Sequence, residues 1–183
     1  MTAKLGTGPD DIAKAFGVPQ WDVLIISDGS ARKGCGWGAL LFDKNGLRKK
    51  MRGAMNWGSI HIAELMPCWH ALAWYAYGPG KAELHRRRSS GKEAKLAVLL
   101  ILDSKTIVAQ GNGDGKKSSN LSVWAALESL QAFGLELHWR WAARAEIADN
   151  RSADQLAREA RQALEKLDTK KGKKNAGKRR RDH

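Results

Sequence analysis

The sequence predicts an α/β fold built on a mixed five-stranded sheet, in which three antiparallel strands are followed by an αβαβα arrangement with helices on both faces. Residues 23–27 form a continuous apolar run, which is typical of a strand covered on both sides, and residues 95–104 form the most apolar strand-like segment of the chain. The segment "DKNG" at 43–46 is a hairpin turn signal between two further strand-like runs. Alternation of strands and helices after the hairpins favours a sheet with helices packed on its faces.

The first half of the chain supplies the antiparallel part of this sheet. Residues 23–27 form the first strand, and 36–42 form the second strand, which leads into the hairpin turn. Residues 47–56 form the third strand, whose polar and basic side chains indicate an exposed face.

The second half alternates between helices and strands. Residues 62–77 are dense in apolar side chains and predict a helix, with Pro67 in its first turn or at a kink. The remaining elements are a strand at 95–104, a helix at 121–133 ended by Gly134, a strand at 135–141 and an amphipathic closing helix at 152–167.

The charge of the chain is its most unusual bulk property. Its 183 residues include 32 Lys and Arg against 19 Asp and Glu, which gives a formal net charge of +13. A polyanionic partner, with nucleic acid foremost, fits this balance. The two cysteines form no CxxC pair, and no apolar stretch approaches the length of a membrane span, so we expect no membrane association and a cytoplasmic protein. A nuclear location is the alternative if the source is eukaryotic.

Composition divides the chain into three parts. Residues 1–20, with several Gly and Pro around a short helical segment, predict a flexible leader, and residues 21–168 form one domain. Residues 169–183 predict a disordered basic tail, because from Lys170 onward eight basic residues stand against one acidic residue with almost no apolar side chain.

Four carboxylates are placed where the predicted fold brings them together. Asp28 ends the first strand and Asp103 ends the fourth, so parallel neighbours would carry both acids to the same sheet edge. Glu64 and Asp154 lie near the starts of the first long helix and the last helix. Each acid alone has an ordinary interpretation as a turn residue or a helix-end charge, but four converging acids would repel one another unless cations lay between them.

Such a set of acids is the composition of a two-metal site for phosphoryl transfer. Magnesium prefers carboxylate oxygens and water, and the four acids are not accompanied by a set of thiolate or imidazole ligands that would suit another metal. We therefore expect two Mg²⁺ ions, with Mn²⁺ as a possible substitute.

Five collinear segments resemble type 1 ribonuclease H. They are "SDGSARKGCGWGALLF", "AELMPCWHAL", "LDSKTIVAQG", "NLSVWAALESL" and "WRWAARAEIADNRSADQLAREA", and together they span about residues 21–167. The resemblance implies a ribonuclease H-like fold and an endonuclease that hydrolyses the RNA strand of RNA–DNA hybrids. It also implies that Asp28, Glu64, Asp103 and Asp154 are the catalytic, metal-binding residues.

The resemblance and the local sequence also indicate substrate-binding residues. Recognition of RNA needs contacts to the 2′-hydroxyl, and Gly29, Ser30 and Ser59 lie beside the first two acids. Trp57, in a turn between Asn56 and Gly58, is a candidate for stacking on a nucleotide or sugar. The other members of the predicted substrate-binding set are Ser104, Asn150, Arg144, Arg86, Arg87 and Arg88.

Three departures from the family pattern leave alternatives open. The loop "AARAEIAD" lacks the family's usual histidine, and Arg144 takes its place, as an arginine does in some retroelement-type and plant-type members. Residues 111–120 leave no room for the basic helical protrusion with which many members grip the hybrid, whereas 78–95 is an insertion containing "HRRR". The alternatives are a catalytically weak or inactive nucleic-acid-binding protein on this fold, or a DNA nuclease of the resolvase or integrase kind. Protein partners are not indicated.

Overall fold

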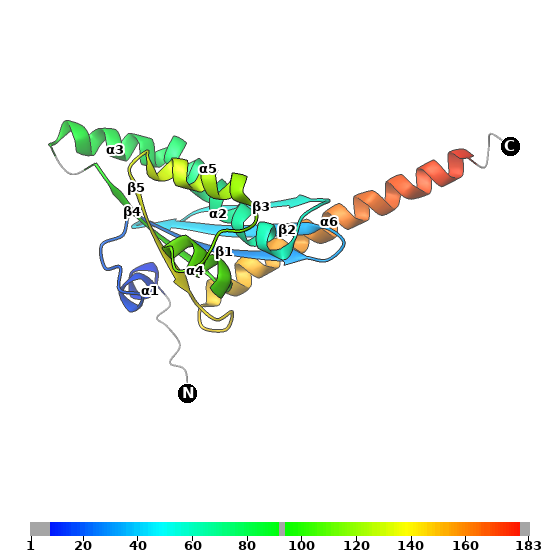
Figure 1. The fold of residues 1–183 in the computed structure, drawn as a ribbon, viewed down its shortest axis with the longest axis horizontal. Helices are drawn as coiled ribbons and strands as arrows, with labels where there is room; N and C mark the ends of the chain where they lie inside the picture. The colour runs from blue at the N-terminus through cyan, green and yellow to red at the C-terminus, as the bar shows by residue number, and fades with distance from the viewer. Residues whose placement is uncertain (1–7, 92–93, 180–183) are drawn as a thin grey trace.

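The computed structural model describes residues 8–91 and 94–179, with side chains to residue 169, and its centre is one five-stranded sheet in the order β3-β2-β1-β4-β5 (Figure 1). The strands are β1 (Val23–Ala31), β2 (Cys35–Asp43), β3 (Gly46–Met55), β4 (Leu96–Leu102) and β5 (Leu135–Trp141). The helices are α1 (Pro9–Ala15), α2 (Ile60–Tyr77), α3 (Pro79–Ser89), α4 (Lys105–Asn112), α5 (Leu121–Gln131) and α6 (Ala148–Arg179).

The pairing confirms the predicted mixed sheet. β1 is antiparallel to β2, and β2 is antiparallel to β3, whereas β1–β4 and β4–β5 are parallel. Ile26 of β1 is opposite Ile101 of β4, so Asp28 and Asp103, each two residues further on, reach the same edge of the sheet. The strand register therefore places the first two carboxylates side by side.

Both faces of the sheet are covered, which explains the continuous apolar run of β1. Val23 and Ile25 pack into a core with α2, α4 and α5, whereas Leu24 and Ile26 pack into a second core with α1 and α6. All four side chains are fully buried, and a strand with two buried faces needs no polar alternation.

Residues 9–18 depart from the expectation of a flexible leader. Ile12 and Ala13 of α1 are buried in the core beneath α6, together with Val18 and Trp21. The indole Nε1 of Trp21 donates a hydrogen bond of 2.9 Å to Asp10, which holds α1 against the body. The sequence of a short segment does not reveal such docking, because burial depends on the surface against which the segment packs. Residues 1–7 lie outside the described residues.

The last helix is longer than predicted, and the expectation of disorder from residue 169 is wrong for the backbone to Arg179. Helix α6 begins at Ala148 and continues to Arg179, projecting beyond the sheet (Figure 1). Residues 169–179 contain five Lys and one Arg and no proline, and Lys and Arg are good helix formers, whereas Gly172 and Gly177 each weaken the helix propensity of this segment. Residues 180–183 of the predicted tail lie outside the described residues.

Other boundaries shift for local reasons. Helix α2 begins at Ile60 because the side chain of Ser59 accepts the N–H of Ile62 as an N-cap, and Pro67 lies inside the helix rather than in its first turn. The 78–95 insertion contains α3, and residues 113–120 join α4 to α5 without a further helix. Within the part of the chain that is described, no helix combines the length and apolarity needed to cross a membrane.

Candidate active site

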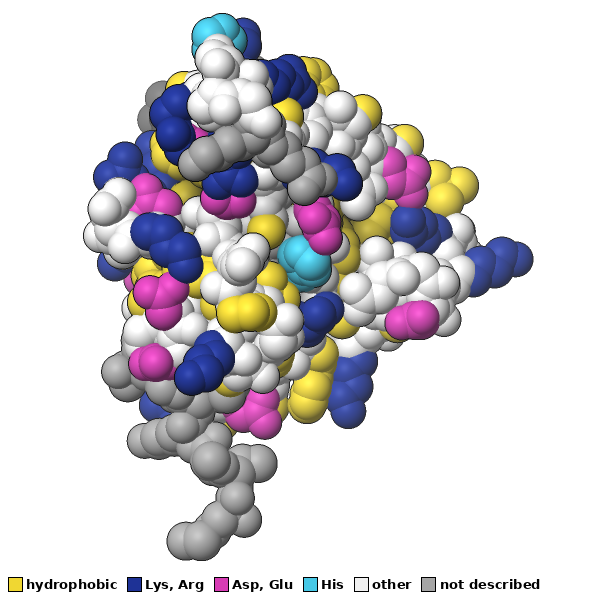
Figure 2. Space-filling model, turned by 90° about the vertical axis from the view of Figure 1, so that its left-hand side faces the viewer, with side chains coloured by type: hydrophobic (Ala, Val, Ile, Leu, Met, Phe, Trp, Pro, Cys, Tyr) yellow, Lys and Arg dark blue, Asp and Glu magenta, His cyan; other side chains and the backbone are white. Residues whose placement is uncertain are grey.

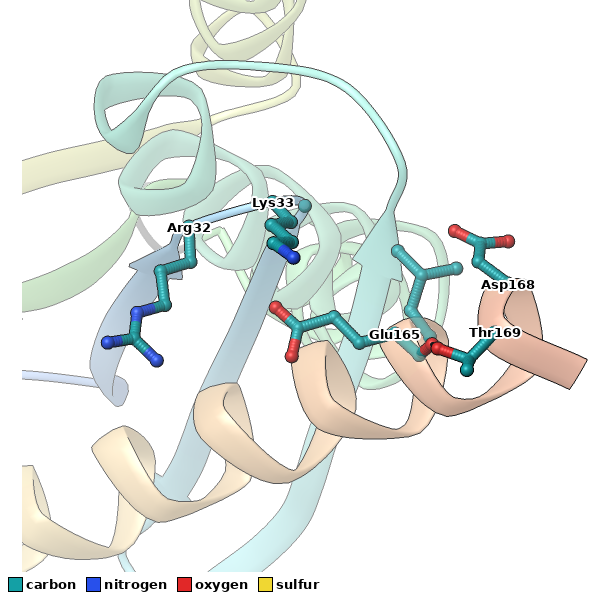
Figure 3. Close-up of a pocket in the computed structure, with 7 residues that line it drawn as sticks. Arg32, Lys33, Glu165, Asp168 and Thr169 are labelled. Atoms are coloured by element: carbon teal, nitrogen blue, oxygen red, sulfur yellow. The ribbon is translucent and has the colours of Figure 1, made fainter. Parts of the chain in front are cut away.

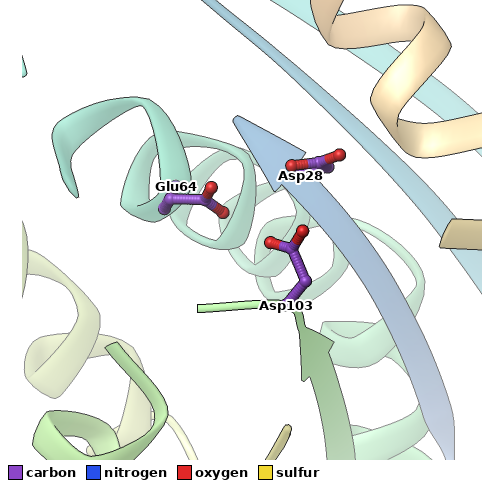
Figure 4. A group of neighbouring side chains, drawn as sticks. All are labelled: Asp28, Glu64 and Asp103. Carbon is purple, nitrogen blue, oxygen red and sulfur yellow. The ribbon is translucent and has the colours of Figure 1, made fainter. Parts of the chain in front are cut away.

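Three carboxylates converge at the carboxyl edge of the parallel strands. Oxygen atoms of Asp28, Glu64 and Asp103 all lie within 4.8 Å of one another, a spacing from which one cation could contact all three (Figure 4). Asp28 comes from β1, Glu64 from the second turn of α2, and Asp103 from the residue after β4. The predicted convergence of these three acids is thus present in the structure.

The fourth acid reaches the same place from α6. Asp154 is not within the tight group, but its Oδ1 lies 3.4 Å from Nη1 of Arg144, whose Nη2 lies 3.0 Å from Oδ2 of Asp103. Asp154 is also paired with Arg158 one helical turn later, at 2.9 Å. The side chains of Asp103 and Asp154 are 21% and 14% exposed, so this half of the cluster is open to solvent.

Two glycines allow the helices that carry Glu64 and Asp154 to approach the sheet. A Cβ on Gly29 would lie 2.6 Å from the carbonyl carbon of Ala63 and 2.7 Å from the Glu64 nitrogen. A Cβ on Gly38 would lie 2.4 Å from the carbonyl oxygen of Ala153. Any larger residue would push α2 or α6 outward, so these glycines set the distance at which the acids meet.

Burial gives two of the carboxylates unusual proton affinity. Burial raises the pKa of Asp28 to about 7, and repulsion from Asp103 adds to this effect, while Arg144 opposes it. Burial raises the pKa of Glu64 to about 9, with further repulsion from Asp28 and Asp103. The backbone N–H of Gly29, which donates to Asp28 Oδ1 at 2.8 Å, works in the opposite direction but does not compensate.

The donor set fits a hard divalent cation. Asp28 Oδ2 and Glu64 Oε2 are buried atoms with no hydrogen-bond partner. Unpartnered buried oxygens are costly, and a cation would satisfy them while lowering both raised pKa values. The set consists only of carboxylate oxygens, which matches Mg²⁺ or Mn²⁺ better than metals that prefer sulfur or imidazole.

Arg144 occupies the centre of the carboxylate group. Its Nη2 lies 3.0 Å from Asp103 Oδ2 and 3.3 Å from Asp28 Oδ2, and its Nη1 lies 3.4 Å from Asp154 Oδ1. It comes from the loop between β5 and α6 and is 46% exposed. The sequence indicated a residue near the last acid, but the structure shows contact with three of the four acids at once.

The loop that carries Arg144 is held by its neighbours. The backbone N–H of Ala143 donates to Glu146 Oε2 at 2.9 Å, and the Asn150 side-chain amide donates to the Ala143 carbonyl at 3.4 Å. Asn150 is only 4% exposed. A buried side chain that fixes this loop helps to position Arg144, and the predicted substrate contact of Asn150 stays a prediction.

The other residues predicted to bind substrate have different surroundings in the structure. Ser59 caps α2, and Ser104 precedes α4 without making a cap hydrogen bond. Ser30 Oγ accepts a hydrogen bond from Arg161 Nε of α6 at 3.0 Å, so an arginine that sequence reasoning missed fixes this hydroxyl. Trp57, between β3 and α2, is 65% exposed and free to stack on a ligand.

The arginines of α3 are not at this site. Arg87 donates to Asp22, immediately before β1, and to the carbonyl of Lys95, immediately before β4. This is the opposite end of the parallel strands from Asp28 and Asp103. Arg86 is paired with Glu83 of its own helix. Viewed from the end of the molecule where α3 lies, Lys and Arg side chains are interspersed with Asp and Glu rather than gathered into one patch (Figure 2).

These contacts place Arg86 and Arg87 away from the acids, and the predicted substrate contacts of Arg86, Arg87 and Arg88 stay a prediction. The sequence showed that these three arginines form a positively charged run, but it did not show at which end of the sheet this run would lie. Local pairing with Asp22 and Glu83 shows that Arg87 ties α3 to the sheet.

Basic residues that the sequence analysis overlooked lie on the β1–β2 turn. Arg32 and Lys33 line a cavity of about 630 Å³ between this turn and Glu165, Asp168 and Thr169 of α6 (Figure 3). The turn directly continues the strand that carries Asp28. The "RK" pair that begins four residues after Asp28 was the signal that the sequence offered.

Comparisons with known proteins assign the fold. No protein-family model matches the chain, and no curated protein sequence matches it. The chain is similar in structure to the N-terminal RNase H domain of Rv2228c from Mycobacterium tuberculosis, solved as a maltose-binding protein fusion, at 22% identity over 81% of this chain and 99% of that chain, with a TM-score of 0.58.

Two further matches carry nucleic acid. LC11-RNase H1 in complex with an RNA/DNA hybrid is 19% identical over 78% of this chain and 99% of that one, with a TM-score of 0.59. The foamy viral protease-reverse transcriptase in complex with an RNA/DNA hybrid is 12% identical over 77% of this chain and 20% of that one, with a TM-score of 0.56.

Proposed function

This chain has a ribonuclease H-like fold, and we propose that it is a metal-dependent endonuclease that hydrolyses the RNA strand of RNA–DNA hybrids. The single observation that carries the proposal is the meeting of Asp28, Glu64 and Asp103 within 4.8 Å, with buried oxygens that lack hydrogen-bond partners. A pure binding module would gain nothing from three adjacent carboxylates, because their mutual repulsion destabilises the fold.

Asp28, Glu64, Asp103 and Asp154 would hold two Mg²⁺ ions, or Mn²⁺ in their place. Bound divalent metal ions supply an activated water and stabilise the leaving oxygen of a phosphodiester. Asp28 and Glu64 form the buried side of the site, where the low dielectric strengthens each electrostatic contact. Asp103 and Asp154 form the exposed side, from which a phosphate would approach.

Selectivity for RNA would come from groups beside the acids. The Gly29 backbone and the hydroxyls of Ser30 and Ser59 are the groups proposed to meet the ribose 2′-hydroxyl. Trp57 would stack on a nucleotide or sugar of the hybrid, since its side chain is exposed just before the start of α2. Arg32 and Lys33 take the place of the α3 arginines as proposed phosphate contacts, and the basic residues from Lys170 onward are proposed as a further source of such contacts.

The test is cleavage of an end-labelled RNA–DNA hybrid in Mg²⁺ or Mn²⁺, with duplex RNA, duplex DNA and each single strand as alternative substrates. Wild-type protein is compared with Asp28→Asn and with Glu128→Gln, a carboxylate on α5 that pairs with Lys117 away from the site. The proposal predicts cleavage of the RNA strand of the hybrid alone, lost in Asp28→Asn and kept in Glu128→Gln.

Two other results would replace the proposal with a different function. Cleavage of duplex DNA in preference to the hybrid would indicate a resolvase- or integrase-like nuclease. Salt-sensitive hybrid binding without cleavage in either metal would indicate a binding module on this fold.

A further inference from the structure

One arginine contacts three of the four carboxylates proposed to bind metal. The Arg144 guanidinium lies 3.0 Å from Asp103, 3.3 Å from Asp28 and 3.4 Å from Asp154. Other arginines on the sheet and α6 have ordinary pairings: Arg52, for example, has one partner, Glu159, at 2.7 Å. A threefold carboxylate contact is therefore a specific feature of this site and not of the basic surface in general.

The oxygens that face Arg144 are among those a cation would use. Asp103 Oδ2 accepts a hydrogen bond from Arg144 Nε at 3.2 Å, and Asp28 Oδ1 accepts one from Nη2 at 3.4 Å, with Oδ2 of the same carboxylate 3.3 Å from that nitrogen. A carboxylate lone pair directed at a guanidinium N–H is not directed at a metal ion. A unit positive charge a few ångströms away also repels a divalent cation, strongly so where burial weakens solvent screening.

The guanidinium can leave without unfolding its loop. Ala142 N–H donates to the Leu102 carbonyl at 3.0 Å, and Ala143 N–H donates to Glu146 at 2.9 Å, so the loop backbone is anchored before Arg144. The Arg144 side chain itself is 46% exposed. Rotation of the side chain is enough to move the charge from the carboxylates into solvent.

We propose that Arg144 is an internal counter-cation that competes with divalent metal for the oxygens of Asp28, Asp103 and Asp154, so that metal binding displaces its guanidinium. This inference rests on the metal centre of the proposed function. Arg144 thereby sets the metal concentration at which the site fills, and it holds the repelling acids together at lower metal concentration. Once displaced, it stays at the carboxyl edge, where an anionic phosphate approaches.

The test is calorimetric titration of EDTA-treated, dialysed protein with Mn²⁺ and with Mg²⁺, which measures affinity without activity. Arg144→Met keeps an unbranched apolar stem but removes the charge, and we expect it to bind metal at least about tenfold more tightly than the wild type. Arg144→Lys keeps the positive charge but lacks the planar guanidinium, and its metal affinity is expected to lie between those of the wild type and Arg144→Met. Arg52→Met, the matched control, removes one exposed arginine from β3 and is expected to retain wild-type affinity.

A second measurement observes the displacement directly. The Nε–Hε resonance of Arg144, assigned by its absence in Arg144→Lys, is expected to shift as Mg²⁺ is added, whereas the Arg52 resonance stays in place. Circular dichroism checks that each variant is folded. If Arg144→Met is not folded, the metal affinity of Arg144→Lys is compared with that of the wild type instead.

The outcomes separate this inference from the proposed function. Equal or weaker metal binding by Arg144→Met, with a wild type that binds metal, would overturn the competition and leave the metal centre standing. Binding by none of the proteins would overturn the metal centre itself, and the competition with it. If Arg52→Met gained as much metal affinity as Arg144→Met, the effect would come from the general charge of the protein, and this result would also overturn the competition.

Discussion

The buried Glu64 carboxyl is predicted to cost the protein stability at neutral pH. Burial raises its pKa to about 9 from an ordinary value of 4.5, so at pH 7 the folded protein keeps a proton that the unfolded chain has released. Each pH unit between these values costs about 1.4 kcal/mol, which amounts to about 3 kcal/mol between pH 4.5 and pH 7. Glu64→Gln, which is neutral at every pH, is therefore expected to stabilise the protein by up to about 3 kcal/mol at pH 7.

The sign follows from proton linkage. Because the folded pKa lies above the unfolded one, the stabilising contribution of protonated Glu64 is complete below about pH 4.5 and is lost as pH rises towards 9. Asp28, with a pKa raised to about 7, acts in the same direction up to that pH. The wild type should thus lose stability between pH 5 and 9 more steeply than Glu64→Gln.

Urea unfolding in EDTA at pH 5, 7 and 9 measures this difference. Glu128→Gln is the control, since it removes an exposed carboxylate of the same type and is expected to change little. A Glu64→Gln variant no more stable than the wild type at pH 7, or a pH dependence parallel to that of the wild type, would refute the reasoning that burial is what distinguishes this carboxyl.

Three further predictions test individual placements. Gly29→Ala, whose Cβ would lie 2.6 Å from the α2 backbone, should cost about 1–3 kcal/mol of stability and about 100-fold in cleavage rate; a wild-type rate would contradict the close-approach argument. Arg87→Met should reduce thermal stability, because it removes the contact with Asp22, yet leave hybrid affinity unchanged in fluorescence anisotropy; a large loss of affinity would restore a substrate role for α3. Trp57→Ala should weaken hybrid binding by about 1–3 kcal/mol without changing thermal stability, and unaltered binding would exclude stacking by this 65% exposed ring.

The sheet and the positions of Asp28, Glu64 and Asp103 could be predicted, because they depend on hydrophobic periodicity and strand direction. The apolar run before Asp28 indicates a strand with two covered faces, and the second such run before Asp103 indicates its parallel neighbour. Parallel strands must end at the same edge, so the two acids follow from topology alone. Glu64 follows from its place near the start of a long apolar helix.

The remaining features depend on tertiary contacts that no local pattern encodes. The run of arginines in α3 suggested contacts with substrate, but the ion pair with Asp22 places Arg87 at the end of the sheet opposite the carboxylates. Docking of Ile12 depends on a surface formed by α6 and the sheet. The threefold contact of Arg144 depends on the conformation of a short loop fixed by Glu146, which propensity does not specify.

Cleavage rate and hybrid affinity measured together on Asp103→Asn test the central claim most directly, that the carboxylate cluster performs the chemistry. Asparagine keeps the shape of the side chain, and Asp103 is partly exposed, so the fold and the surrounding surface should persist. The account predicts a rate in Mg²⁺ lower by at least about 100-fold, as expected when a metal-binding charge is removed, with hybrid affinity unchanged within about twofold. Wild-type cleavage by Asp103→Asn would contradict the account and place the reaction elsewhere on the molecule.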